Sequence, residues 1–375
     1  MIDRENGEKP LPTWLRRLSL RAFRNYSSVN LELSPGLTLV VGPNGHGKTN
    51  LIEAINFLCL GRSYRERNNK RVIMFGARQA RLYGELEWDG SGHNIEIVLD
   101  SDGKKAAKVD GAALRRISEL VGEVPVVSLT PEDGDLVGGE PGARRRFLDL
   151  ILAQSDRGYL EALRRYRRAL LQRNASLRDG RQALAETYEV PLIENAVVIR
   201  QKRAALTEFL AGSAGETYNT ISQQDENFTV CYRPNPAGEA SNRHNVAEAL
   251  ARARDTDAER GFTSVGPHRD DVYMEVDGRQ LRTYGSHGQA RTALATLKLA
   301  EVSYYAEVYD RPPLLVMDEV AAVLDRTRAA NLVGLLADMS SQVFVTSPSE
   351  EDLSVVARAA GCIVDVDRGR AKTRR

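Results

Sequence analysis

The chain has 375 residues, enough for two or three domains, and its 42% hydrophobic and 27% charged residues are typical of a folded globular protein. No apolar run approaches the roughly 18 residues of a membrane span, and residues 1–12 are polar, which predicts a loose tail and not a signal peptide. The net charge of +1 means that any nucleic-acid site must be a local patch. Cys59, Cys231 and Cys362 lie far apart without metal-ligand spacing, which predicts reduced thiols in a cytoplasmic protein.

The first elements predicted are strands. Residues 18–23 and 29–33 alternate between apolar and polar side chains, as half-buried strands do. A turn at Pro35 and Gly36 then leads into a third strand, residues 37–41, whose apolar and β-branched side chains indicate full burial.

A phosphate-binding loop follows this strand. The pattern G-x-x-x-x-G-K-[ST] is fulfilled by Gly42, Pro43, Asn44, Gly45, His46, Gly47, Lys48 and Thr49, with Asn50 next. Apolar residues at 51, 52, 55 and 58 predict a helix directly after it. A chance match of this pattern occurs in roughly one chain in a hundred of this length, but the strand before it and the helix after it favour nucleotide binding. Lys48 is then expected to reach the β and γ phosphates, and Thr49 to bind Mg²⁺.

A basic loop lies close in sequence to this motif. Its cations are Arg62, Arg65, Arg67, Lys70 and Arg71. They are either a solvated charged surface or contacts to DNA phosphates, and the sequence favours neither.

Residues 80–110 are predicted to be strands, with turns at residues 89–90 and 102–103. From about 140 to 220 the pattern becomes helical and arginine-rich. Leu160, Leu163, Tyr166, Leu170 and Leu177 form one apolar stripe, and Ile193, Val197, Ala204 and Leu210 form a partner stripe. Two helices of about 25 residues reach only about 40 Å, which predicts a short arm. Arg144, Arg145 and Arg146 face solvent, a phosphate or the neighbouring lobe; the sequence does not rank these.

The segment 233–260 is predicted to be a linker back to the first lobe. The expected domains are therefore a discontinuous lobe I, residues 13–125 plus 262–372, and an inserted helical lobe II, residues 126–261. Residues 1–12 and 373–375 are expected to be flexible tails.

A second group of catalytic residues follows an apolar strand at residues 314–317. It ends in Asp318 and Glu319, the form of a Walker B element. Asp318 is expected to hold Mg²⁺, and Glu319 to orient the attacking water as a general base. Asp325 is expected to cap the next helix, and residues 342–347 to form another buried strand that ends in two hydroxyl side chains.

A glycine-flanked serine begins a long amphipathic helix about 25 residues before the Walker B strand. Ser286, Gly288 and Gln289 fit the pattern S-x-G-Q. A serine here is either a plain helix cap with a flexible turn or part of an anion site at the helix N-terminus. Its position ahead of a Walker B strand favours the second interpretation.

These motifs together resemble the ABC-type ATPase head, and over nearly the whole length the chain resembles the RecF family of bacterial recombination mediators. The blocks that carry this resemblance are residues 20–26, 35–38, 47–54, 61–65, 131–133, 144–149 and 266–271. Residues 131–133 followed by 144–149 form one block, and 266–271 another, that belong to this family and not to ABC proteins at large.

The resemblance implies an α/β fold: an ABC-type, SMC-like P-loop ATPase head with an inserted, mainly helical lobe and a short arm. It also implies a slow ATPase that uses ATP and Mg²⁺ and forms an ATP-dependent homodimer, in which Lys48 of one subunit and Ser286 of the other clamp one nucleotide. Glu132 lies where related heads have a glutamine that senses Mg²⁺ or the γ-phosphate. His46, His287 and Glu319 depart from the residues usual in the family.

The implied function is DNA repair and replication. The resemblance points to binding of duplex DNA at gaps or single-strand/double-strand junctions, and to RecR as a partner, with RecO and RecA in the same pathway on SSB-coated DNA. The protein is then expected in the cytoplasm at the nucleoid, with no membrane partner. An ABC-type ATPase coupled to a membrane partner is the alternative, and the family-specific blocks argue against it. A nucleotide-binding scaffold with little turnover is a third interpretation, and the two carboxylates of the Walker B element argue against that one.

Overall fold

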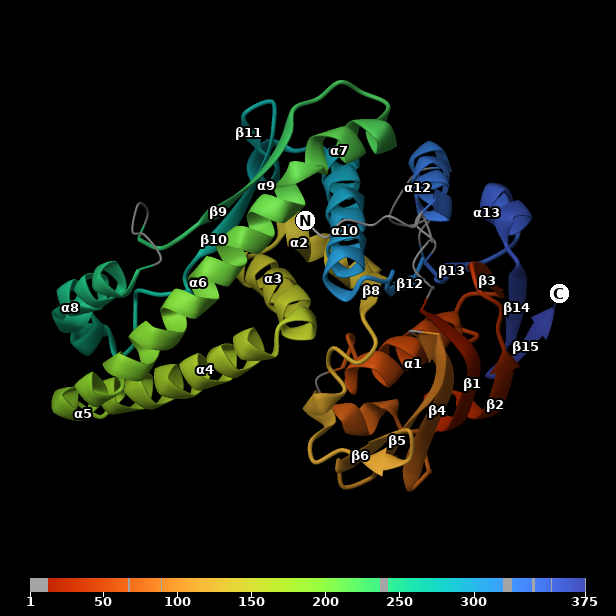
Figure 1. Cartoon of the computed structure of the whole chain (residues 1–375), viewed down its shortest axis with the longest axis horizontal. Coiled ribbons are helices and arrows are strands. Elements are labelled where there is room, and N and C mark those ends of the chain that lie inside the picture. Colours follow the sequence, from red (N-terminus) through yellow and green to blue (C-terminus); the bar gives the residue numbers. More distant parts are fainter. Residues whose placement is uncertain are drawn as a thin grey trace. The chain divides into compact units, whose positions relative to one another are not determined.

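The computed structural model of the chain describes residues 13–66, 68–88, 90–236, 242–319, 326–338, 341–351 and 353–374 (Figure 1). The chain divides into two compact units. The sheet unit comprises Met1–Gly134, Thr220–Ser222 and Ala295–Arg375, and the helical unit comprises Asp135–Asn219 and Gln223–Leu294.

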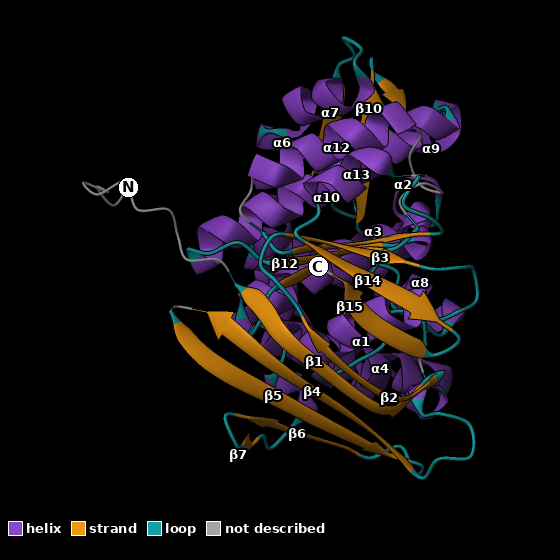
Figure 2. Cartoon of the chain, turned by 90° about the vertical axis from the view of Figure 1, so that its right-hand side faces the viewer, coloured by secondary structure: helices purple, strands orange, loops and turns teal. Residues whose placement is uncertain are grey.

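An antiparallel sheet forms one layer of the sheet unit (Figure 2). Its strand order is β2-β1-β4-β5-β6-β7. The strands are β1 (Trp14–Phe23), β2 (Tyr26–Glu32), β4 (Gln79–Trp88), β5 (Ser91–Asp100), β6 (Lys105–Val109) and β7 (Ala112–Ala113). Buried and more exposed residues alternate along β2 and β4, so one face of the sheet covers the core and the other faces water. The turn predicted at residues 102–103 joins β5 to β6, while Asp89 lies outside the described residues.

A mostly parallel sheet forms the second layer. Its order is β15-β14-β3-β13-β12-β8, with β3 (Leu37–Val41), β8 (Val126–Leu129), β12 (Leu314–Met317), β13 (Val343–Ser347), β14 (Cys362–Asp367) and β15 (Arg370–Arg374). The N-terminal strand β3 thus lies between two strands from the C-terminal end of the chain (Figure 1). Strands β12 and β13 are buried at every position, which explains why they appear in the sequence as continuous apolar runs.

Helix α1 (Lys48–Leu60) contacts both sheets of this unit. Burial extends beyond its apolar positions to Glu53 and Asn56, which are 0% and 1% exposed. The Arg24 guanidinium donates two hydrogen bonds to Glu53, at 2.8 and 2.7 Å, and thereby balances the buried carboxylate. The sheet unit also contains the 3₁₀ turns η1 (Asn69–Val72), η2 (Ile117–Glu119) and η3 (Pro131–Gly134), and the helices α12 (Arg326–Asp338) and α13 (Ser354–Ala359).

The helical unit is built around a pair of long helices, α4 (Arg157–Arg178) and α6 (Glu189–Gly212). They have 22 and 24 residues, so each spans roughly 35 Å, the length of the predicted short arm. A three-stranded sheet, in the order β11-β10-β9, accompanies them. The other elements are α2 (Asp135–Gly138), α3 (Pro141–Ser155), α5 (Gln182–Thr187), β9 (Phe228–Arg233), α8 (Arg243–Arg260), β10 (Asp271–Val276), β11 (Arg279–Gln280) and α9 (Leu281–Tyr284).

Two helices cross the division between the units. Helix α7 (Ala214–Ser222) begins in the helical unit, and α10 (His287–Tyr309) begins there and continues into the sheet unit.

The boundaries between the two units differ from those predicted from the sequence, which were at 125/126 and 261/262. Residues 126–129 belong to the sheet unit because β8 pairs with β12. Residues 271–276 belong to the helical unit because β10 pairs with β9. At the C-terminus, residues 373 and 374 were expected in a flexible tail, but they complete β15, which pairs with β14. Long-range strand pairing determines all three differences, and none is visible in local sequence.

Buried ion pairs fill much of the helical unit. Arg200 and Asp270 are both 0% exposed and share two hydrogen bonds, at 2.9 and 3.0 Å. Arg173 pairs with Asp257 at 2.7 Å, with 1% and 0% of their side chains exposed. Since a buried charge is costly without a partner, each guanidinium requires its carboxylate for the unit to fold.

These ion pairs explain where the predicted apolar stripe on α6 fails. Ile193, Val197 and Ala204 are only partly buried, whereas Arg200 and Arg203 occupy core positions. Arg203 donates to Asp149 at 2.7 Å and to the Pro267 carbonyl at 2.7 Å. Of the predicted stripe only Leu210 is buried, so a pattern that counts only apolar residues misses much of the face of this helix that lies in the core.

The two family-specific blocks meet inside the same unit. Arg144 donates to Asp271 at 2.7 and 3.1 Å, and Arg145 donates to the Asp270 carbonyl at 2.6 Å. Arg144 and Arg145 thus take none of the three environments left open for them, because both bind partners within their own unit, whereas Arg146 is exposed.

His268 in the second block is held neutral. Its Nε2 donates to the Thr263 carbonyl at 2.9 Å, so Nδ1 accepts the hydrogen bond from the Tyr166 hydroxyl at 2.6 Å. Burial lowers the pKa of His268 from 6.5 to about 4. An unfolded chain would therefore bind a proton here between pH 6.5 and 4 when the folded chain does not.

We expect His268 to make the protein less stable as the pH falls through this window. Between pH 7 and pH 5 the loss from this group is roughly 2 kcal/mol, because only the unfolded state is protonated there. The measurement is the free energy of unfolding at both pH values for the unaltered chain and for His268→Gln, whose amide cannot titrate. The variant should lose less stability on acidification, and equal losses in the two proteins would contradict the assignment.

Candidate functional site: a phosphate loop facing two carboxylates

The phosphate loop leaves β3 at Gly42 and enters α1 at Lys48. Two of its glycines are required because a side chain would clash with neighbouring atoms and because their backbone conformation favours glycine. Gly42 has φ +155°, and a Cβ there would lie 2.1 Å from the Val366 carbonyl oxygen; Gly47 has φ +126°, and a Cβ there would lie 2.7 Å from the Asn25 side chain. No other residue fits either position without displacing the loop.

Lys48 folds back across this loop. Its ammonium donates to the carbonyl of Gly42 at 2.6 Å and to that of Pro43 at 3.1 Å. Burial lowers the pKa of Lys48, and the nearby charges of Glu319 and Asp318 oppose that shift. The cation is therefore held at the loop, ringed by oxygen atoms whose place phosphate oxygens can take.

The carboxylates come from the end of β12, two strands away from β3 in the same sheet. Thr346, at the end of the intervening strand β13, donates its hydroxyl proton to Asp318 at 2.8 Å and accepts the Glu319 backbone N–H at 2.8 Å. Glu319 has φ +50°, a left-handed conformation that is uncommon for a non-glycine residue. Strain of this kind is found where a side chain must be aimed at a site.

Asp318 is 2% exposed, and burial raises the pKa of its carboxyl group. Hydrogen bonds from Thr346 and Thr49 oppose this shift by stabilising the ionised form. The phosphate loop and the Walker B carboxylates, far apart in the sequence, are thus near enough for each to shift the pKa of the other.

This donor set fits ATP with Mg²⁺. Thr49 is close enough to Asp318 to lower the pKa of its carboxyl group, so a hydroxyl and a carboxylate oxygen lie at the same site. A hard cation prefers such oxygen ligands. The buried ammonium of Lys48 and the N-terminus of α1 supply the charge that a triphosphate needs.

A turn between β1 and β2 supports the loop from behind. Asn25 donates to the His46 carbonyl at 2.8 Å, and the Tyr26 hydroxyl donates to the Gly47 carbonyl at 2.9 Å. The Gly369 N–H also donates to the His46 carbonyl, and the His46 ring contacts Asp367 at 2.9 Å. Sequence pattern alone predicts no role for Asn25 and Tyr26, although both lie in a block that carries the family resemblance.

Glu132 lies in η3 of the same unit. Its carboxylate is 3.6 Å from Arg65, whose guanidinium also donates to Asn50 at 3.3 Å. Arg65 thus links the residue that follows the phosphate loop to the carboxylate predicted to sense Mg²⁺ or the γ-phosphate.

The other predicted DNA contacts, Arg62, Lys70 and Arg71, are exposed on the sheet unit. Arg71 pairs with Glu66 at 3.5 Å. Arg67 and the predicted helix cap Asp325 lie outside the described residues.

Ser286 begins α10 in the helical unit and forms a reciprocal cap with Gln289. The Gln289 N–H donates to the Ser286 hydroxyl at 3.1 Å, and the Ser286 N–H donates to the Gln289 side chain at 2.9 Å. This is a capping box. Ser286 and His287 remain exposed, Gly288 is partly buried, and Gln289 donates to Glu226 at 2.7 Å.

A parallel sheet with a phosphate loop, a Walker B carboxylate pair and a serine-capped helix defines an ABC-type ATPase head of the SMC kind. The sequence model of the RecF/RecN/SMC N-terminal domain matches residues 14–370. The Smc head domain of Pyrococcus furiosus has the same fold, with a TM-score of 0.59 at 17% identity over 96% of each chain.

Two closer relatives identify the family. The DNA replication and repair protein RecF of Shouchella clausii is 36% identical over 370 residues, which cover 96% of this chain and 99% of that protein. A solved structure of the recombination mediator RecF with ATP superimposes with a TM-score of 0.89 at 27% identity, over 99% of this chain and 100% of the other. The chain therefore belongs to the RecF family.

Within the parts of the chain that the structure describes, no helix is both long and apolar enough to cross a bilayer.

We expect Thr346→Val to weaken Mg²⁺-dependent ATP binding roughly tenfold to a hundredfold. The substitution keeps the shape of the side chain but removes the hydrogen bond to buried Asp318, and a bond to a charged group contributes about 1.5–3 kcal/mol. Calorimetric titration with ATP, with and without Mg²⁺, measures the effect. Thr346→Ser keeps the hydroxyl and should bind like the unaltered chain; a valine variant that also does so would refute the role of Thr346.

Proposed function

We propose that this protein is an ATP-driven switch for DNA repair and replication. Nucleotide binding by the sheet unit pairs two copies, the pair holds duplex DNA beside a single-stranded gap, and slow hydrolysis of ATP to ADP and phosphate releases it. The arrangement that supports this proposal best is the convergence of Lys48, Thr49, Asp318 and Thr346 at the carboxyl ends of three neighbouring strands.

Each residue of the site has a role that follows from its chemistry. Lys48 balances the β and γ phosphates, and Glu319, exposed at the end of β12, positions and deprotonates the attacking water. Bound Mg²⁺ would be held by Thr49 and Asp318, with Glu132 near it, and would neutralise charge that develops on the phosphates.

The second half of the nucleotide site is supplied by another copy of the chain. Ser286 is exposed at the N-terminus of a helix of 23 residues, with Gly288 and Gln289 in the first turn. Exposed N–H groups and the helix dipole favour a phosphate at this position. In the dimer, Ser286 of one subunit would face the nucleotide held by Lys48 of the other.

DNA contacts are assigned to the basic loop that follows α1. Arg62, Arg65, Arg67, Lys70 and Arg71 would bind phosphates without reading sequence, since phosphate contacts carry no base information. The solved relative named above belongs to a RecFOR pathway. By that likeness we place RecR as a direct partner, with RecO and RecA in the same process on SSB-coated gaps in the nucleoid.

We expect a Glu319→Gln variant to be monomeric without nucleotide and dimeric with ATP and Mg²⁺. The amide keeps the shape of the side chain but cannot take a proton, so the nucleotide stays intact. Molecular mass in solution, measured by light scattering with and without ATP, reports the change.

Two further variants control this experiment. Ser286→Ala in the Glu319→Gln background should bind ATP but remain monomeric, and Lys48→Ala should bind little ATP. A Glu319→Gln chain that stays monomeric with ATP while holding duplex DNA equally well in both conditions would show that nucleotide does not control DNA binding.

The basic loop gives a separate prediction. With saturating ATP, Lys70→Glu combined with Arg71→Glu should weaken binding to duplex DNA and lower the slope of log affinity against log salt by about 2, because each phosphate contact contributes about 0.9. Two charge reversals at Lys104 and Lys108, exposed lysines of the same unit, make the matched control. Equal DNA affinity and equal slope in both variants would remove the loop from the DNA interface.

A further inference from the structure

Tyr64, in the segment that follows α1, carries a buried hydroxyl group. The residue as a whole is partly exposed, but its hydroxyl oxygen is shielded from solvent. Within the part of the chain that the structure describes, this oxygen has no hydrogen-bond partner. Because burying a hydroxyl without a partner costs free energy, such a group marks a place where a ligand can supply the missing bond.

Contacts on both sides of Tyr64 fix its place in the sheet unit. The Ser63 hydroxyl donates to the buried carboxylate of Glu53 in α1. The same hydroxyl accepts the backbone N–H groups of Arg65 at 3.0 Å and of Glu66 at 2.9 Å. A serine hydroxyl that bonds the backbone ahead of it stabilises a turn. The backbone that carries the Tyr64 side chain is therefore tied to the helix that begins at the phosphate loop.

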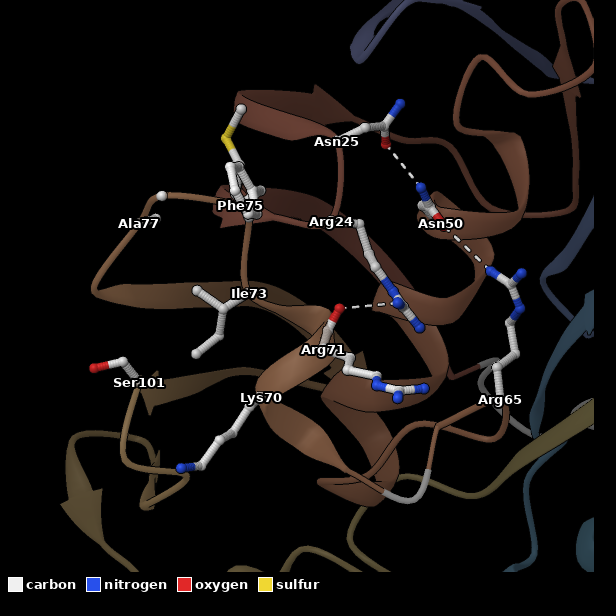
Figure 3. Close-up of a pocket in the computed structure, with 12 residues that line it drawn as sticks. Arg24, Asn25, Asn50, Arg65, Lys70, Arg71, Ile73, Phe75, Ala77 and Ser101 are labelled. Atoms are coloured by element: carbon white, nitrogen blue, oxygen red, sulfur yellow. Dashed lines mark hydrogen bonds between the residues drawn. The ribbon is translucent and has the colours of Figure 1, made fainter.

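Arg65 extends these contacts toward the metal-binding residues. Its guanidinium donates to the Asn50 side chain at 3.3 Å, one residue after Thr49 (Figure 3), and lies 3.6 Å from the Glu132 carboxylate. Burial raises the pKa of Asp318, and the nearby charge of Arg65 opposes that shift. This segment thus passes close to the residues assigned to Mg²⁺.

The Tyr64 side chain lies among the carboxylates of the same site. Burial raises the pKa of Tyr64, and the charges of Asp318, Glu132 and Glu53 raise it further. The phenol therefore keeps its proton and is a hydrogen-bond donor, yet none of these three carboxylates accepts that proton. Glu319, the next residue after Asp318, is assigned to the water that attacks the γ-phosphate. The end of the nucleotide nearest to Tyr64 is accordingly its γ-phosphate.

We propose that the Tyr64 hydroxyl donates a hydrogen bond to a γ-phosphate oxygen of bound ATP and so lets the site distinguish ATP from ADP. The inference deepens the proposed function, because it rests on nucleotide binding at the phosphate loop. The bond forms only with a nucleotide that carries the third phosphate. Since the hydroxyl is already buried without a partner, it gives up no bond to water when it binds the phosphate, and the gain goes to ATP affinity.

The test is calorimetric titration of Tyr64→Phe with ATP and with ADP, each with Mg²⁺. The titrations use the Glu319→Gln background, in which ATP is expected to stay intact. Phenylalanine keeps the ring and removes only the hydroxyl. ATP binding should weaken roughly tenfold to a hundredfold, the effect of losing a hydrogen bond to a charged group. ADP affinity should stay unchanged, because ADP lacks the acceptor.

The free energy of unfolding without nucleotide is the second measurement. Removing an unpartnered hydroxyl from a buried position should leave this free energy unchanged or raise it. A fall in Tyr64→Phe would show that the hydroxyl already has a partner in the nucleotide-free protein, and that result would overturn the proposal.

Tyr83→Phe is the matched control variant. The Tyr83 hydroxyl donates to Glu85 at 3.3 Å on the partly exposed face of β4, in the same unit, so its loss should change neither nucleotide affinity. Unchanged ATP affinity in Tyr64→Phe would overturn the proposal. Equal losses for ATP and ADP would do the same, because they would place the hydroxyl on a group that both nucleotides share.

A failure of the proposed function itself gives a different result. If the Glu319→Gln parent bound neither ATP nor ADP, the phosphate loop would not be a nucleotide site, and both proposals would fall. If the parent bound ATP and Tyr64→Phe bound it equally well, the nucleotide site would stand and only the role of Tyr64 would be refuted.

Discussion

A lysine ammonium held in a partly desolvated loop needs negative charge close by, and the sheet unit is arranged to supply it. Lys48 follows β3, whereas Asp318 and Glu319 follow β12, and β13 lies between these strands. Only parallel strands in this order bring all their carboxyl ends to one edge. Thr346 then bridges the gap from the end of the middle strand. Strand order is therefore the condition on which the chemistry of the site depends.

Buried charge serves a different purpose in the helical unit. The block at residues 144–149 and the block at 266–271 are joined directly by the Arg144–Asp271 pair and indirectly by Arg203, which binds both Asp149 and the Pro267 carbonyl; all these residues belong to the helical unit. Such pairs add little net stability over apolar packing, but they strongly penalise any arrangement that leaves one partner alone. The residues most distinctive of the family thus specify how this unit folds, while the residues shared with other ATPases form the catalytic site.

The sequence predicted the parts of the site that local pattern determines. The strand before Gly42, the loop and the helix after it form one contiguous motif, and Asp318 follows an unmistakable apolar strand. The tether of the loop by Asn25 and Tyr26 was not predictable, because it depends on how a distant turn folds. The burial of Arg200 and Arg203 was not predicted for another reason. Arginine is usually a surface residue, and only the positions of Asp270 and Asp149 in the fold show that these two are paired in the core. The extra strand at residues 370–374 likewise depends on a partner strand.

The turn between β1 and β2 links the loop to the exposed surface of the sheet unit. Arg24 binds Glu53 of α1 through one side of its guanidinium and the Arg71 carbonyl through the other, and the next residue, Asn25, binds the loop itself. Helix α1, the phosphate loop and the segment that carries Lys70 to Phe75 are therefore fastened to one another by short hydrogen bonds. Such a set of contacts resists independent movement of its parts. In the proposed function, these contacts are the physical connection between the nucleotide site and the basic loop assigned to DNA.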